Sequence, residues 1–157
     1  VSYEYHKTGS FSFPNPSYLF KQSDWVYFVF SNPTGIFRVR YQLKDELDTI
    51  CHALKDEGIE SFVFVNQYQF RPEQEKLMMQ QAMKEIDHCD LLIAAASEKA
   101  IGIGIEAGYA KGKGKTVIYI RHEAAPHSTT LSGISDHQII YEDLPELSTR
   151  LERIFRK

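Results

Sequence analysis

Residues 94–120 read AAASEKAIGIGIEAGYAKGKGKTVIYI, and the order of elements in this segment sets the fold class. An apolar run ends at Ser97, two glycines follow, and the carboxylate of Glu106 stands among small and apolar residues. A short helix is expected to begin near Gly104 and to end in KGKG, before a second apolar run. Strand, glycine turn, helix and strand in this order predict one unit of a parallel sheet.

The same alternation extends over the rest of the chain. Continuous apolar runs predict strands at 25–30, 61–65, 90–96, 116–120 and 138–141. Helical spacing of apolar residues predicts longer helices at 41–57 and 72–89, and a last helix that starts near 143. Because the strands are apolar on both faces, the sequence predicts an α/β fold: a mostly parallel five-stranded sheet with helices on both faces.

Composition indicates one domain and excludes some partners. The chain has 157 residues, of which 43% are hydrophobic, enough for one sizeable core. We expect a single domain over 25–157, preceded by an aromatic segment, 1–24, that is irregular or forms an interface. The net charge of −3 argues against nucleic acid or an anionic membrane as a partner. No apolar run approaches the ~20 residues of a membrane span.

The cysteines and histidines predict a cytoplasmic protein without a metal site. Cys51 and Cys89 each fall in a predicted helix, and we interpret them as free buried thiols. A disulfide or a shared metal is the alternative for this pair. The six histidines show none of the spacings typical of metal ligands, so no metal site is expected.

The loop after the third strand is the candidate site, because parallel sheets bind ligands beyond the carboxyl ends of their strands. Gly102 and Gly104 would let the backbone approach a ligand closely. Glu106, expected in the first turn of the next helix, would be kept ionised by the helix dipole and could act as a nucleophile or base. The ordinary alternative is a glutamate that only complements this dipole.

Five residues at fixed spacing carry a resemblance to a known family: Gly102, Gly104, Glu106, Gly108 and Ala110, followed by GK and an apolar strand. With DLLIAAAS before it, the segment 80–141 resembles the nucleoside 2-deoxyribosyltransferases, a family that includes 2'-deoxynucleoside 5'-phosphate N-hydrolases. The resemblance implies a flavodoxin-like three-layer αβα sandwich. It also implies a homodimer or higher homo-oligomer with shared sites, a nucleoside or nucleotide substrate and no cofactor. Glu106 would attack the anomeric carbon on a retaining route.

The resemblance suggests further substrate-binding residues. Ser31 and Asn32 follow the first strand, where the family has a sugar-binding loop. Ser128 stands five residues before Gly133, as does the serine that contacts a 5'-phosphate from the adjacent subunit in the hydrolases. The full set of substrate-binding candidates is Ser31, Asn32, Ser97, Gly102, Gly104 and Ser128.

Two departures from the family pattern leave the activity open. Ala100 and Ala82 occupy positions where the family often has a polar or acidic partner for the leaving base. Ser97, Glu98 or Asp87 are possible substitutes. Hydrolysis and transfer are therefore equally compatible with the sequence. Two other hypotheses are a TIR-like NAD glycohydrolase, which also uses a glutamate, and a non-catalytic nucleotide-binding module.

Overall fold

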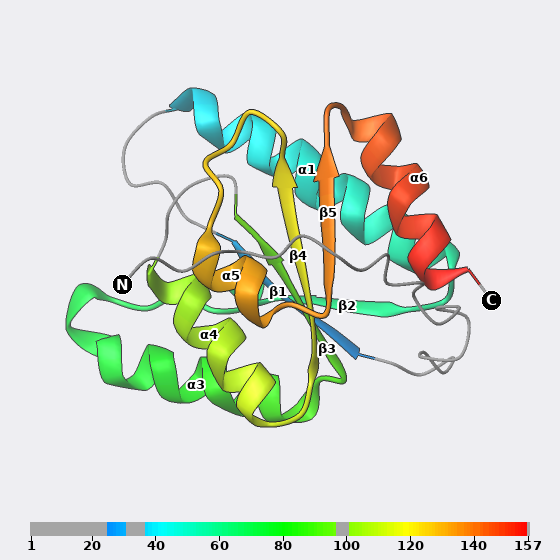
Figure 1. The fold of residues 1–157 in the computed structure, drawn as a ribbon. Coiled ribbons are helices and arrows are strands. Elements are labelled where there is room, and N and C mark those ends of the chain that lie inside the picture. Colours follow the sequence, from blue (N-terminus) through cyan, green and yellow to red (C-terminus); the bar gives the residue numbers. More distant parts are fainter. Residues whose placement is uncertain (1–24, 31–36, 97–100, 157) are drawn as a thin grey trace, which may run out of the picture.

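The computed structural model describes residues 25–30, 37–96 and 101–156, and a parallel sheet lies at its centre (Figure 1). The sheet has the order β2-β1-β3-β4-β5, and every neighbouring pair is parallel. The strands are β1 (Trp25–Phe30), β2 (Glu60–Val63), β3 (Leu91–Ala95), β4 (Thr116–His122) and β5 (His137–Tyr141). The α/β fold with a parallel sheet is confirmed, and the strand order is that of flavodoxin-like sheets.

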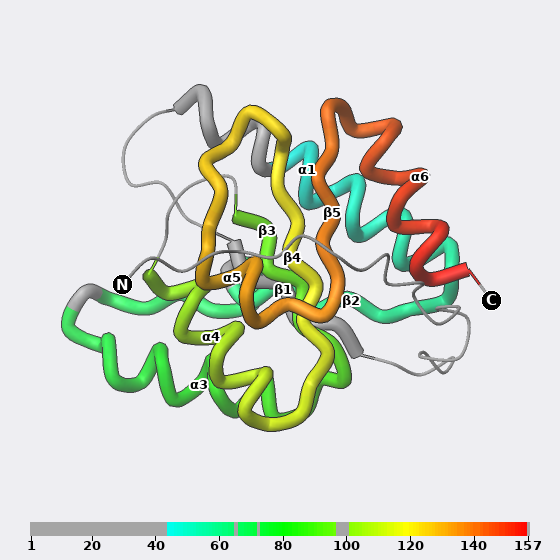
Figure 2. The backbone as a smooth tube through the Cα atoms, in the orientation of Figure 1, coloured from blue at the N-terminus to red at the C-terminus, as the bar shows by residue number. Residues whose placement is uncertain are grey.

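Helices cover both faces of the sheet, which gives three layers (Figures 1 and 2). On one face α1 (Phe37–Asp56) and α6 (Leu144–Phe155) contact each other. On the other face lie α3 (Glu75–His88), α4 (Ile101–Gly112) and α5 (Thr129–Ile134), with α4 in the middle. Two short elements, α2 (Phe64–Gln67) and the 3-10 helix η2 (Pro72–Gln74), connect β2 to α3.

The sheet separates two apolar cores. All of β3 is buried, because Leu91, Ile93 and Ala95 pack toward α1 and α6 while Leu92 and Ala94 pack toward α4 and α5. A strand covered on both faces needs apolar residues at every position, which explains the continuous runs in the sequence.

The cysteines belong to opposite faces of this sheet. Cys51 packs against the core under α1 and α6, whereas Cys89 belongs to the core under α3, α4 and α5. The Cys89 thiol donates a hydrogen bond to the carbonyl of Ile86 at 3.2 Å. No disulfide joins the two residues, so the alternative of a bonded pair is wrong.

Several element boundaries differ from those expected. The helix expected from 41 begins at Phe37, since no glycine or proline interrupts 37–40. The strand expected at 61–65 ends at Val63, and α2 starts at the next residue. Its partner β1 pairs with it only as far as Phe28↔Val63, so tertiary context outweighs the β-branched and aromatic pattern.

The two boundaries nearest the candidate site are also corrected. Helix α4 begins at Ile101, three residues before the expected start at Gly104, because glycine weakens a helix without preventing it. Helix α5 was missed within a polar loop. Its signals are local: the Ser128 hydroxyl accepts a hydrogen bond from the Leu131 amide as an N-cap, and Leu131 is buried.

Three lysines, one in the last turn of α4 and two directly after it, bind groups at the amino edge of the sheet. Lys111 pairs with Asp136, Lys113 pairs with Asp87, and the Lys115 ammonium donates to the Cys89 carbonyl at 2.5 Å. Asp136 also accepts a hydrogen bond from the Val117 amide at 2.9 Å. The lysines therefore serve the fold at the edge opposite to the candidate site.

We expect Asp136→Asn to lower the free energy of unfolding by about 1 kcal/mol at pH 7, a value reduced because the pair with Lys111 is partly solvent-screened. Burial raises the pKa of Asp136, but the bonds from Lys111 and the Val117 amide outweigh this and lower it overall. A lowered folded-state pKa stabilises the fold fully above the unfolded value of about 3.9. That stabilisation disappears as the pH falls through the folded-state pKa.

Urea unfolding at pH 7 and in acid measures this difference. The difference in the free energy of unfolding between wild type and Asp136→Asn should shrink in acid. Asp56→Asn, at an exposed position, should change the free energy of unfolding little at either pH. A gap of equal size at both pH values would contradict the electrostatic origin of the effect.

Candidate functional site

The carboxyl ends of β1 and β3 are the natural binding position in this sheet. These strands are neighbours, with Phe30 paired to Ala95, and the strand order reverses between them. Ligands bind at this switch point in open parallel sheets. Of the expected substrate-binding residues, Ser31 and Asn32 follow β1 and Ser97 follows Ala96, and all three lie outside the residues that the structure describes.

Glu106 lies in the second turn of α4, not in the first turn as the sequence suggested. The earlier start of the helix at Ile101 causes the difference. The dipole effect falls off within the first turn, so the helix terminus interacts less strongly with the Glu106 carboxylate than it would with a first-turn residue. The side chain is half-buried, next to buried Ala107.

The contacts of α4 place Glu106 and Gly104 on different sides of this helix. Tyr109 and Lys113 both contact Asp87 of α3, and they follow Glu106 by three and seven residues, the spacing of one helix side. Lys111 contacts Asp136 beyond α5, and it follows Gly104 by seven residues. Glu106 therefore belongs to the side of α4 that faces α3, and Gly104 to the side that faces α5.

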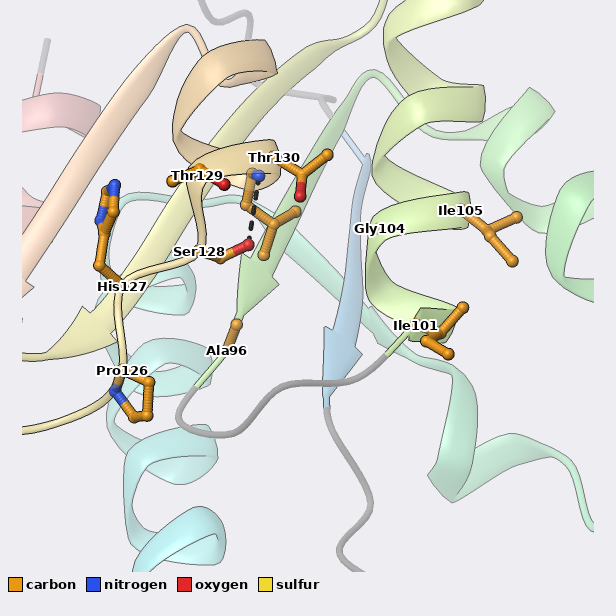
Figure 3. Close-up of a pocket in the computed structure, with 10 residues that line it drawn as sticks. Ala96, Ile101, Gly104, Ile105, Pro126, His127, Ser128, Thr129 and Thr130 are labelled. Atoms are coloured by element: carbon orange, nitrogen blue, oxygen red, sulfur yellow. Dashed lines mark hydrogen bonds between the residues drawn. The ribbon is translucent and has the colours of Figure 1, made fainter.

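A cavity of about 660 Å³ opens on the α5 side of α4 (Figure 3). Its size is that of a small-molecule site. One wall is the start of α4, and the other is the loop before α5 together with the first turn of α5, which carry three consecutive hydroxyl side chains. The lining residues are Ala96, Ile101, Gly104, Ile105, Pro126, His127, Ser128, Thr129, Thr130 and Leu131. Gly104 and Ser128 are thus brought together, whereas Gly102 and Glu106 do not line this cavity.

Ser128 is fixed from two directions. Its hydroxyl accepts from the Leu131 amide at 3.4 Å, and its own amide donates to the Tyr119 hydroxyl at 3.1 Å. Tyr119 is itself buried in β4. The Ser128 hydroxyl forms no other hydrogen bond within the described residues, so its remaining lone pair and its proton are available there to a ligand in the cavity.

The structure argues against Asp87 as a substitute for the acidic residues that the family often places near the leaving base. Asp87 lies near the end of α3, just before β3 begins, and so at the amino edge of the sheet. The loop after β3 leaves the opposite, carboxyl edge. Hydrogen bonds from Lys113 and Tyr109 lower the pKa of Asp87, which keeps it ionised and unsuited to act as an acid. Ala82 is buried on α3, while Glu98 and Ala100 lie outside the described residues.

Two residues of β4 shape the cavity wall and were missed in the sequence. Tyr119 holds the Ser128 amide, and the Arg121 guanidinium binds the carbonyl group of His122, the last residue of β4, and two carbonyl groups of the loop that follows. The sequence offered only a weak signal for them. Residues two apart in a strand share a face, so the tyrosine and the arginine are polar side chains at the end of an otherwise apolar strand face.

The described residues contain neither a cluster of metal ligands nor a membrane-spanning helix. Within 25–30, 37–96 and 101–156, no three histidine, cysteine or acidic side chains gather as metal ligands would. Within the same ranges no helix combines the length and apolarity required to cross a bilayer.

Comparison with known proteins places this geometry in context. The family model of nucleoside 2-deoxyribosyltransferases matches residues 35–147. Among solved structures, the CMP N-glycosidase BcmB of Clostridium botulinum is 24% identical, with a TM-score of 0.59 over 82% of this chain and 98% of that chain. No curated protein matches the sequence significantly.

Two further structures have the same fold. A 2-deoxyribosyltransferase of Bacillus psychrosaccharolyticus is 16% identical, with a TM-score of 0.57 over 81% of this chain and 95% of that one. A conserved protein of Enterococcus faecalis V583 is 14% identical, with a TM-score of 0.62 over 83% of this chain and 98% of that chain. At these identities the similarity concerns the fold.

Proposed function

The chain belongs to the nucleoside 2-deoxyribosyltransferase family, and from that premise we propose that it cleaves or exchanges the N-glycosidic bond of a (deoxy)nucleoside or nucleotide. The observation that carries the proposal is the position of Glu106. It lies on α4, the helix that follows β3 in the chain, within the glycine pattern on which the resemblance rests, and β3 borders the switch point of the sheet. A TIR-like NAD glycohydrolase is the weaker hypothesis, because the family match covers this segment.

In the proposed reaction Glu106 is the nucleophile. Its carboxylate attacks the anomeric carbon, the bond to the base breaks, and the departing base takes a proton from solvent water. A second base or water then attacks the same carbon and releases Glu106. Two displacements at one carbon retain its configuration.

The two sides of α4 support a site that two subunits share. In one chain, Glu106 faces α3 whereas the Ser128 hydroxyl lies in the cavity on the α5 side. We propose that the Ser128 loop of a neighbouring subunit completes the site of Glu106 and binds the 5'-phosphate of a nucleotide. Repulsion supports this separation, since two like charges ~4 Å apart near a surface repel by ~4 kcal/mol.

We expect at least a homodimer at micromolar concentration, measured by sedimentation. Ile101 and Ile105 project from the start of α4 (Figure 3). Ile101 is 86% exposed and Ile105 is 48% exposed, and such exposed apolar side chains support association. Ile101→Glu should raise the dimer dissociation constant about tenfold or more, and Ile140→Glu on β5 is the matched control. A monomeric wild type would contradict both the association and the shared site.

A panel of substrates tests the activity itself. Ribo- and deoxyribonucleosides, their 5'-monophosphates and NAD are incubated with the protein, with and without a second free base. Free sugar as product indicates hydrolysis, a new nucleoside indicates transfer, and cleavage of NAD alone supports the glycohydrolase hypothesis.

A non-catalytic nucleotide-binding module is the second candidate, favoured by buried Ala82. An alanine there cannot protonate or orient a leaving base. Binding of a nucleotide without release of base would select this candidate.

A further inference from the structure

Arg121 lies at the carboxyl end of β4 and binds the loop that leads to the cavity. Its Nη1 donates to the carbonyl oxygens of His122, Glu123 and Ala125 at 3.2, 2.9 and 3.1 Å. Three carbonyl groups from one turn thus converge on a single guanidinium nitrogen. The next residue after this turn, Pro126, begins the cavity wall.

The charge of Arg121 is not neutralised by its partners. Carbonyl oxygens are neutral, and no carboxylate lies within salt-bridge distance of this guanidinium in the part of the chain that the structure describes. Its Nε is buried and has no hydrogen-bond acceptor among the same residues. Within the described residues the positive charge at this strand end is therefore not neutralised, and the described lining of the nearby cavity contains no lysine, arginine or acidic side chain.

Arg121 and Tyr119 act on the same loop from the same face of β4. Side chains two residues apart in a strand point to one face, at a separation of about 7 Å. Tyr119 fixes the loop at the Ser128 amide, and Arg121 fixes it at the turn 122–125. The backbone of Pro126 and His127, which line the cavity, lies between these two anchors.

We propose that Arg121 is a positioning residue for the cavity: it holds the loop 122–128 in its binding conformation and gives the cavity the positive potential that a phosphate monoester requires. This inference rests on the proposed function for its substrate, a nucleotide. It assigns to Arg121 no contact with the substrate. The charge acts through space, and the loop transmits the rest of the effect, because the guanidinium is already bound to backbone carbonyls.

The test compares Arg121→Met and Arg121→Lys with the wild type. Inorganic phosphate is titrated against each protein by NMR, and amide hydrogen exchange is followed over 122–128. Arg121→Met should bind phosphate about fivefold more weakly and exchange these amides at least about fivefold faster, since it removes both the anchor and the charge. Arg121→Lys should recover much of the affinity but less of the protection, because an ammonium keeps the charge without the planar fork.

Arg153→Met is the matched control, an exposed arginine of α6. It should leave phosphate affinity and loop exchange unchanged. Added salt should weaken phosphate binding more in the wild type than in Arg121→Met. Unchanged affinity and exchange in Arg121→Met would overturn the inference, as would a uniform loss of protection over the whole chain. Both readouts are independent of turnover, so a wild type that cleaves no nucleotide would refute the proposed function alone.

Discussion

Glu106→Ala is expected to abolish glycosidic bond cleavage while the fold is retained. Removing a covalent nucleophile costs several orders of magnitude in rate, so turnover should fall by at least about 10³-fold. The side chain is half-buried on α4, and its loss leaves the buried side of the helix, formed by Ile103, Ala107 and Ala110, intact. The free energy of unfolding should therefore change by less than about 1 kcal/mol.

Two further variants define the role of this carboxylate. Glu106→Gln keeps the size of the side chain but removes the charge, and it should be as inactive as Glu106→Ala. Glu57→Ala alters a glutamate at the end of α1, at the other edge of the sheet, and should retain full activity. Near-normal turnover in Glu106→Ala would exclude the mechanism, as would product sugar with inverted configuration at the anomeric carbon.

The fold could be predicted from the sequence because the evidence for it is local. Runs such as 91–95 are apolar at every position, and only strands buried on both faces require that pattern. The predicted boundaries of helices and strands were wrong where local sequence signals conflict. Gly102 and Gly104 suggested a turn, yet the backbone there is helical, and this error moved Glu106 from the second turn to the first. The expected effect of the helix dipole was overestimated for the same reason.

The site was harder to predict because it depends on which side of an element a residue occupies. Spacing in the sequence brought Gly104 and Glu106 into one motif. Residues two positions apart in a helix, however, point in directions that differ by about 200° around its axis. Only the contacts of α4 with Asp87 and Asp136 show which neighbour each side faces. Likewise, Arg121 gains its role from carbonyl groups that a folded turn presents, and no residue type in the sequence marks such a turn.

Ser128→Ala is expected to raise the Michaelis constant for a 5'-nucleotide about tenfold or more and to leave that for the unphosphorylated nucleoside almost unchanged. A hydrogen bond to a charged group contributes about 1.5–3 kcal/mol, which sets this magnitude. Because the Ser128 hydroxyl also caps α5, the variant should lose about 1 kcal/mol of stability. Ser128→Thr keeps a hydroxyl for both roles and should behave like the wild type.

Mixed oligomers decide whether Ser128 serves the site of its own chain or that of its neighbour. In a heterodimer of one Glu106→Ala chain and one Ser128→Ala chain, a shared site would combine Glu106 of one chain with Ser128 of the other. Such a dimer should contain one complete site and show the Michaelis constant of the wild type at about half its turnover. If both residues served the same chain, the single active site would lack Ser128 and keep the raised Michaelis constant. Equal effects of Ser128→Ala on nucleoside and nucleotide would show instead that the loss of the α5 cap, and not of a phosphate contact, causes the change.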